Sequence, residues 1–354
     1  MFSFRTTPLE DQLDRALTDG NVGCFCTQNC WDTARERYMY DIFRERGNLK
    51  AVFSPGTPEL APGNSGIEAA PEVLAGLNAV AVEIQDTGSR YSGYTRDVFR
   101  LMKTLSEMEE APALYIVDHE NPAGRVVEGT MPSRTCEPFT PKIAHRHGLT
   151  LGELANLYYQ EIGAKFPLHI ISAAAGGTGK SIMPWTIAPA PDITGLFTCE
   201  MYSGGGLWAG TTVTPGIGTA RPYEYLGAPF IRHGSGKGLP AVQQVMMRPC
   251  SFIPAWGKYA GEVCQGYQII LEPGAEYHSL MHTLQMMRYF KDTYSAFELS
   301  PEFYTRLSDE TLASYVDGET EWSEAREHIK VEEQKWIRKA RKFTLYDEQP
   351  YRIK

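Results

Sequence analysis

Short apolar runs alternate with longer amphipathic stretches through the first half of the chain. The run at residues 79–82 is too short and too rich in valine to be a good helix, which predicts a strand buried on both faces of a sheet. The predicted strands cover residues 21–26, 49–53, 79–83, 113–118 and 168–172. The predicted helices cover residues 8–17, 31–46, 98–110 and 150–162. Strands that alternate with helices are typical of a parallel sheet with helices on both faces, so we expect an α/β fold.

The pattern changes after Pro189. Residues 203–230 are rich in Gly, Thr, Pro and aromatic side chains and show no helical period. The elements predicted beyond them are a strand and two helices, at residues 268–271, 278–289 and 321–346. Because 354 residues are many for one hydrophobic core, we expect two domains. The first is a Rossmann-like parallel-sheet domain over residues 1–190, and the second is a smaller α+β domain over residues 191–354.

The charge balance argues against one class of partner. The formal net charge is −9, whereas a general nucleic-acid binder needs a basic surface. This charge does not argue against a small-molecule or sugar substrate. Residues 1–20 lack the apolar stretch of a signal peptide, and no window approaches the roughly 18 apolar residues of a membrane span. We therefore expect a cytoplasmic protein that binds neither nucleic acid nor a membrane.

Acidic side chains follow two of the predicted strands. Glu83 and Asp86 come at the end of one strand, Asp118 and Glu120 at the end of the next, and Glu128 follows shortly after. Because the ends of neighbouring strands lie close together, these carboxylates would crowd one cleft and push each other's pKa values apart. One acid and one base or nucleophile is what glycoside hydrolysis needs. The alternative is that these residues serve as helix caps and salt bridges.

The segment AAAGGTGKS at residues 173–181 partly matches a phosphate-binding loop. Its end fits the pattern, but Ala174 stands at the position of the first glycine. Pro184 lies where the following helix must run, and the phosphate cradle depends on the N-terminus of that helix. We therefore expect an ordinary glycine-rich loop and no nucleotide cofactor.

Two further groups could bind a metal or move a proton. Cys24, Cys26 and Cys30 have spacings that fit no common zinc pair, and only Cys136 is a plausible fourth ligand, so we expect buried free thiols and no metal. The odd number of cysteines, seven, also favours reduced thiols over a disulfide framework. The segment HRHG at residues 145–148 could bind an anion or shuttle a proton, or its histidines could cap backbone carbonyls.

Several segments, in a preserved order, resemble one family. The segment EIQDTGSRYSGY at residues 83–94 resembles the motif DIQDVGVRFYTY, and RHGLTLGELA at residues 146–155 is almost identical to RHGMTIGELA. Shorter matches lie at residues 53–55, 118–122, 127–129, 185–192 and 218–230. On these motifs the chain resembles the NamZ-type exo-β-N-acetylmuramidases over nearly its whole length.

The resemblance implies a Rossmann-like N-terminal domain, a smaller C-terminal domain and a cleft between them. It also implies removal of N-acetylmuramic acid from the non-reducing ends of peptidoglycan fragments, without a metal or nucleotide. The acid/base pair of such a glycoside hydrolase would be Glu83 or Asp86 with a second carboxylate, Glu59 or Glu128. The other candidate substrate-binding residues are Gln85, Arg90, Tyr94, Asp118, His147, Thr211 and Glu224, together with the ring-stacking candidates Trp208 and Tyr223.

The chain departs from the family pattern in three loops. At the glutamate that we take as the family's acid/base, the gapless match gives Gly56 and Thr57, so Glu59 would be a displaced carboxylate. Elsewhere two acids and an arginine are replaced by Ala209, by the proline at position 215 and by the isoleucine at position 217. Loss of the arginine weakens the expected grip on a muramic-acid carboxylate. A second hypothesis is therefore a family member that has lost catalysis and binds a glycan or a partner protein.

Overall fold

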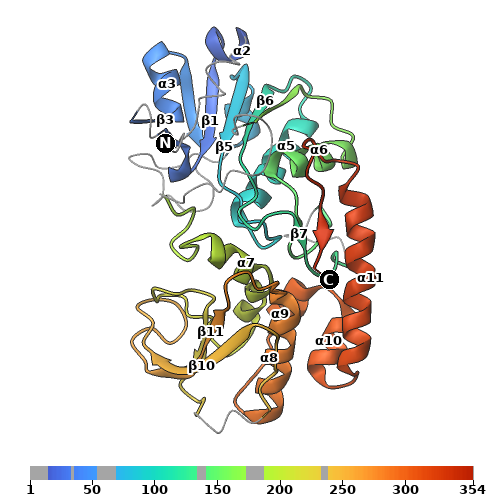
Figure 1. Cartoon of the computed structure of the whole chain (residues 1–354). Coiled ribbons are helices and arrows are strands. Elements are labelled where there is room, and N and C mark those ends of the chain that lie inside the picture. The colour runs from blue at the N-terminus through green and yellow to red at the C-terminus, as the bar shows by residue number, and fades with distance from the viewer. Residues whose placement is uncertain are drawn as a thin grey trace.

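The computed structural model describes residues 15–32, 36–53, 69–133, 141–172, 187–232 and 238–353 (Figure 1). Its first sheet has five parallel strands in the spatial order β4, β1, β5, β6, β8. Their bounds are Leu49–Phe53, Val22–Cys26, Ala79–Glu83, Ala113–Asp118 and Leu168–Ser172. Chain order therefore reads 2-1-3-4-5 across the sheet, and the direction of winding reverses between β1 and β5.

Both faces of this sheet are covered, which explains why its strands are apolar without interruption. Neighbouring residues of a strand point to opposite faces. In β5 the alanines pack in one buried cluster with helix α3 (Met39–Arg46). The valines of β5 pack in another cluster with α5 (Gly93–Glu107) and α6 (Leu151–Glu161). This arrangement confirms the predicted α/β fold with helices on both faces of a parallel sheet.

The predicted helix at residues 31–46 forms only in its second half. Its first half contains two short strands, β2 (Trp31–Asp32) and β3 (Arg37–Tyr38), which pair in antiparallel fashion. The rings of Trp31 and Tyr38 pack edge to face across this pair with their centroids 4.8 Å apart. Such cross-strand aromatic pairs stabilise a sheet. The remaining short elements of this part are α2 (Arg15–Thr18), η1 (Gln28–Cys30), α4 (Pro71–Leu74) and β7 (Val126–Val127).

A second sheet lies in the later part of the chain. It is antiparallel, and its strands are β10 (Val245–Phe252), β11 (Cys264–Leu271) and β9 (Tyr225–Ala228), in that order. The helices around it are α7 (Leu196–Gly205), η3 (Gly206–Gly210), α8 (Ser279–Thr293), α9 (Pro301–Leu307) and α10 (Glu310–Asp317). These elements share one large buried cluster, and Figure 1 shows α7 between the two sheets.

The sequence pattern missed α7 and β10. Six of the ten residues of α7 are buried, and the helix carries apolar and small residues with little amphipathic contrast. Strand β10 contains Pro249, which argues against a central strand. It can hold this proline because it lies at the edge of the sheet.

One helix contacts both parts of the chain. α11 (Trp322–Ala340) runs along one edge of the molecule, from α10 toward α6 (Figure 1). Its first half places Ala325 and Ile329 in the buried cluster of the second sheet, and its second half places Trp336 in that of the first. The chain then returns to the first part, where β12 (Tyr351–Arg352) pairs with β7. The division into domains at residue 190 stays a prediction.

Candidate active site

The carboxyl edge of the first sheet gathers the acidic residues that the sequence singles out. Glu83 is the last residue of β5, and its register partner in β1 is Cys26. These two strands flank the point where the winding reverses. In open α/β sheets, ligands bind in the crevice outside the carboxyl ends of the strands at such a point.

Glu83 pairs with an imidazole. His119 Nε2 lies 2.9 Å from Glu83 Oε1, and the two side chains are only 9% and 2% exposed. His119 follows directly after β6, the neighbour of β5. The Gln85 side chain donates to the carbonyl oxygens of Asp86 and Glu120 at 3.0 and 3.3 Å, which ties the two strand ends together. A buried carboxylate beside a histidine can exchange a proton with it, as acid–base chemistry requires.

Asp86 is buried and organises the turn after β5. Its Oδ2 accepts a hydrogen bond from the N–H of Gly88 at 2.9 Å, its Oδ1 accepts one from Thr95, and His147 Nε2 lies 3.1 Å from Oδ2. Burial acts to raise the pKa of Asp86, but the charge of His147 and these hydrogen bonds outweigh burial and lower this pKa. The carboxylate is therefore stabilised as an anion inside the turn. His147 itself is fully buried.

Asp118 anchors the N-terminus of α6. Its carboxylate accepts hydrogen bonds at 2.7 Å from the Thr150 hydroxyl, the Gly152 N–H and the Tyr346 hydroxyl. Burial nevertheless raises the pKa of Asp118 to about 6. A β-carbon at Gly152 would lie 2.6 Å from the Asp118 carboxylate, so only glycine allows this close approach. Asp118, His119, Thr150 and Tyr346 border a small pocket of about 70 Å³.

Glu128 belongs to a buried charged network that joins the two parts of the chain. Its Oε1 accepts from Arg146 at 2.8 Å, and its Oε2 accepts from the Leu280 N–H at the start of α8 at 3.1 Å. His278 lies between two carboxylates, with Nδ1 3.3 Å from Glu128 and Nε2 2.7 Å from Glu333. These contacts favour a structural role for Glu128 in place of a second catalytic carboxylate.

Arg90 and Tyr94 also make contacts inside the protein. The Arg90 guanidinium donates to the carbonyl oxygens of Thr130 at 2.9 Å and Leu307 at 2.8 Å. The second acceptor belongs to the last turn of α9, where orphan carbonyls carry partial negative charge. Tyr94 is half-buried and packs against the core of the first sheet. Arg90 therefore fastens the turn after β5 to the later part of the chain.

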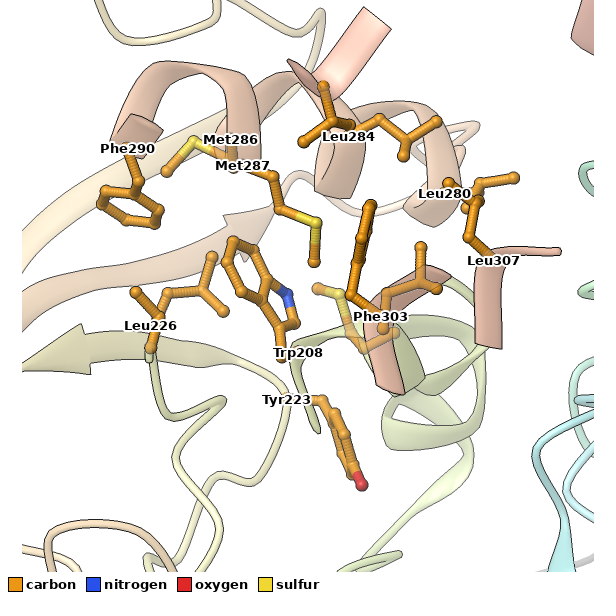
Figure 2. Packing of buried hydrophobic residues seen from close by; sticks show 14 of the residues in the cluster. Trp208, Tyr223, Leu226, Leu280, Leu284, Met286, Met287, Phe290, Phe303 and Leu307 are labelled. Carbon is orange, nitrogen blue, oxygen red and sulfur yellow. The ribbon is translucent and has the colours of Figure 1, made fainter. Parts of the chain in front are cut away.

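The two predicted stacking residues lie in the core of the second part (Figure 2). Trp208 is 1% exposed, and its ring packs against Phe290 with centroids 5.8 Å apart. Tyr223 is buried at the border of this cluster, with its hydroxyl directed away from Trp208 and its ring 4.9 Å from that of Tyr202. Thr211 is also buried, and its hydroxyl donates to the Trp208 carbonyl at 3.1 Å. Neither ring presents an open face to a sugar here.

A larger pocket, of about 610 Å³, lies between the start of α7 and the end of β11. Glu224 borders it and pairs with Arg221 at 3.0 Å. Glu200 borders it too, and burial raises the pKa of Glu200 against the lowering effect of Arg146.

Sequence reasoning missed Glu200 because it lies on a helix that the pattern does not predict. It also missed the role of His119, although an imidazole directly after a strand-end acid was a usable signal.

Several predicted features lie outside the described residues. These are Glu59 with Gly56 and Thr57, the glycine-rich loop at 173–181, and Cys136. Cys24, Cys26 and Cys30 are buried and free, as expected. In the described ranges, no group of three or more His, Cys, Asp or Glu side chains is arranged to hold a metal ion. Among the helices that the structure describes, none is both long and apolar enough to cross a membrane.

The fold and this edge define an α/β protein with a buried carboxylate–imidazole pair at the switch point of its parallel sheet. Two family models together cover most of the chain. The model for the N-terminal part of exo-beta-N-acetylmuramidase NamZ matches residues 64–194, and the model for its C-terminal part matches residues 200–346. The chain belongs to this NamZ family.

One curated relative is the peptidoglycan beta-N-acetylmuramidase NamZ of Bacillus subtilis (strain 168). It is 26% identical over an alignment of 237 residues, which covers 63% of this chain and 56% of the relative. Two solved structures of DUF1343 family proteins from Bacteroides fragilis NCTC 9343 share the fold. Their TM-scores are 0.77 and 0.78 at 20% and 18% identity, and they match 96% of this chain and 97% and 98% of their own chains.

Proposed function

We propose that this protein is a glycoside hydrolase that removes an amino sugar of the N-acetylmuramic-acid type from peptidoglycan fragments. Membership of the NamZ family supports the substrate class. The observation that carries the proposal is the buried Glu83–His119 pair at the carboxyl edge of the sheet, where this kind of sheet binds ligands. The sugar would bind in a cleft between residues 1–190 and 191–354.

In this proposal Glu83 is the acid/base carboxylate, and His119 holds its Oε1 in place and shares its proton. The second carboxylate is Glu59, which follows β4 in the sequence, and β4 is separated from β5 by β1. Hydrolysis with two carboxylates requires one protonated and one ionised group on either side of the glycosidic bond. Glu83 is the candidate for the first role, because its Oε1 lies 2.9 Å from an imidazole that can exchange a proton with it.

Asp86, Asp118 and Glu128 then act as supports. Each has its carboxylate oxygens occupied by protein donors, so none can reach a substrate without breaking those bonds. His147 and Arg90 hold the turn after β5 in the same way. Such supporting contacts fix a reacting group within the narrow limits that catalysis needs.

The test is release of free N-acetylmuramic acid from a disaccharide of N-acetylmuramic acid β-linked to N-acetylglucosamine. The expected result is release of the non-reducing sugar, with the N-acetylglucosamine dimer as a control that yields little product. No release from this disaccharide or from a related chromogenic amino sugar would overturn the proposal. Binding of the disaccharide without release would favour the family member that has lost catalysis.

A further inference from the structure

Strand β11 extends beyond its neighbour β9. β9 pairs with residues 265–268 of β11 and starts at Tyr225, whereas β11 continues to Leu271. One further bond, from the Ile269 N–H to the Glu224 carbonyl at 2.8 Å, continues this pairing. In the described part of the chain, the end of β11 therefore has no strand beside it on this side.

The backbone of Leu271 is directed toward this open side. In an antiparallel strand the N–H and C=O of one residue point to the same side, and successive residues alternate. The Ile269 N–H points toward β9, so those of Leu271 point there as well. The Glu272 N–H donates to the Gln244 carbonyl at 3.0 Å on the opposite side, in agreement with this alternation. No described residue bonds to the N–H or the C=O of Leu271, which leaves one donor and one acceptor open.

These two groups border the pocket of about 610 Å³ between the start of α7 and the end of β11. Its volume lies within the range of roughly 300–1,000 Å³ that small-ligand sites have. Arg221 and Glu224, which precede β9, line the same pocket, so it lies on the side to which the Leu271 backbone is directed. The open donor and acceptor therefore face the pocket.

Helix α7 contributes an aromatic ring and a carboxylate to the same pocket. Phe197 and Glu200 both line it, and because they are three residues apart they lie on one face of the helix. Both residues are half-buried. Among the residues that the structure describes, none forms a hydrogen bond or an ion pair with the Glu200 carboxylate. This carboxylate can therefore accept a hydrogen bond from a ligand.

The pocket thus carries a hydrogen-bond donor and an acceptor on separate elements. The Leu271 N–H belongs to β11, and the Glu200 carboxylate belongs to α7. A trans secondary amide carries its N–H and its C=O on opposite sides, so it can bridge a donor and an acceptor on two walls of one pocket. The acetamido group of an N-acetylated sugar is such an amide. An aromatic ring such as that of Phe197 suits the apolar face of the sugar ring.

We propose that this pocket is a carbohydrate subsite for an N-acetylhexosamine unit of the glycan, separate from the scissile bond. The Leu271 N–H donates to the acetamido oxygen, the acetamido N–H donates to Glu200, and the Phe197 ring packs on the apolar face of the sugar. None of these three residues lies at the carboxyl edge of the first sheet, where Glu83 and His119 are. For its ligand class, the subsite rests on the proposed function.

A sugar suits this pocket better than a peptide strand does. An added strand needs a row of open N–H and C=O groups along the edge of a sheet. Beyond Leu271, Glu272 bonds to Gln244 and Pro273 has no N–H, so this end of the edge offers a single open N–H among the described residues. One amide can bind there, whereas an extended peptide finds no further donors.

The first test compares ligands by titration calorimetry on the full chain. The N-acetylglucosamine trimer should bind at least about tenfold more tightly than cellotriose, which is the same β-1,4-linked chain without acetamido groups. Acetyl-trialanine amide, a peptide with the same kind of amide, should also bind more weakly than the trimer. Equal affinity for cellotriose would overturn the acetamido contact, and tighter binding of the peptide would overturn the sugar as the ligand.

The second test locates the binding in this pocket. Leu271→Pro removes the open N–H but no bond of the sheet, so the protein should fold while its affinity for the trimer falls by roughly tenfold. Leu271→Ala is the matched control, because it keeps the N–H and should keep the affinity. Phe197→Ala should show a similar loss, whereas Phe197→Tyr keeps the ring and should bind like the wild type. Wild-type affinity in folded Leu271→Pro and Phe197→Ala would overturn the subsite, as would an equal loss in Leu271→Ala.

Turnover separates this subsite from the proposed function. A wild-type protein that binds the trimer through Phe197 and Leu271 but releases no sugar from the N-acetylmuramic acid disaccharide would leave the subsite standing and remove the glycosidase. A wild-type protein that releases sugar but binds cellotriose as tightly as the trimer would do the reverse.

Discussion

The surroundings of Glu83 distinguish it as the proposed acid/base residue. Its side chain is almost closed to solvent, and its Oε1 meets an imidazole at 2.9 Å. A histidine beside a carboxylate keeps that carboxylate pointing in one direction and can exchange a proton with it. Asp86, Asp118 and Glu128 are also buried, and backbone N–H groups, hydroxyls or an arginine donate to their carboxylates.

Replacement of His119 should affect turnover more than stability. His119→Asn removes the imidazole that orients and protonates Glu83, so we expect kcat on the muramic acid disaccharide to fall by about 10²-fold with a small change in KM. The melting temperature should stay close to that of the wild type. His328→Asn is the control, because His328 pairs with Asp309 near the surface. Equal turnover in His119→Asn and wild type would contradict the assigned role.

The sequence could predict which acids lie at the carboxyl edge, because strand ends in a parallel sheet must meet there. It could not predict which of them bind backbone N–H groups and side chains of other elements. That depends on partners far away in the chain, such as Tyr346 at Asp118 and Leu280 at Glu128. The same limit applies to Trp208, an aromatic residue at a motif position that turns out to fill the core.

At the scale of elements, the N-terminus of α6 supports the candidate site. The Thr150 hydroxyl caps this helix by accepting a hydrogen bond from the Glu153 N–H at 3.2 Å. The Glu153 carboxylate in turn accepts one from the Thr150 N–H at 2.9 Å. The pattern Thr-x-x-Glu is the sequence signature of this capping box. The Thr150 hydroxyl also donates to Asp118 at 2.7 Å, which links the cap to the end of β6.

Loss of this cap should destabilise the protein. Thr150→Ala removes the cap and one donor to a buried carboxylate, so the free energy of unfolding should fall by about 1–2 kcal/mol. Urea unfolding measures this change. Thr104→Ala serves as the control: the Thr104 hydroxyl is exposed on α5, and alanine is a better helix former than threonine. A loss in the control as large as in Thr150→Ala would show that capping is not the cause.

The strands were the easiest elements to predict, since a short valine-rich run that is buried on both faces has few alternatives. The predicted bounds of β4, β5, β6 and β8 agree with the structure. The hairpin of β2 and β3 was mistaken for helix because its charged residues also suit a helical pattern. Its formation depends on the pairing of Trp31 with Tyr38, which a single stretch of sequence does not reveal.

At the scale of the whole molecule, a charged network and one helix hold the parts of the chain together. Glu128 and Arg146 belong to the first part, His278 lies at the start of α8, and Glu333 is on α11. With His278 protonated, the network joins two buried carboxylates to Arg146 and His278, and the Arg352 guanidinium lies 4.0 Å from Glu333. Loss of one charge from a buried network leaves another uncompensated.

This network predicts a pH dependence of stability. Burial acts to lower the pKa of His278, but Glu128 and Glu333 outweigh burial and raise it above the ordinary value of 6.5. The stabilisation is therefore fully present below 6.5 and is lost as the pH rises through the raised pKa. Asp118 has a pKa of about 6, so most of its carboxyl group is already ionised when the pH rises above 6.5.

The free energy of unfolding of the wild type should accordingly decrease as the pH rises above 6.5. His278→Gln, measured by urea unfolding at each pH, should be less stable at pH 6.5 and should lose this slope. His328→Gln, which changes a histidine outside the network, should keep it. A wild-type stability that is flat or rises across this window would contradict the charge assignment.

The central claim is that Glu83 is the acid/base carboxylate of a muramidase-type glycosidase. The most direct measurement compares kcat of wild type, Glu83→Gln and Glu45→Gln on the disaccharide of N-acetylmuramic acid and N-acetylglucosamine. Glu45 is a surface glutamate paired with Arg37 and controls for the chemical change. Glu83→Gln should bind the disaccharide with unchanged affinity while its kcat falls by roughly 10²–10⁴-fold, and Glu45→Gln should match the wild type. Wild-type turnover in folded Glu83→Gln would contradict the central claim.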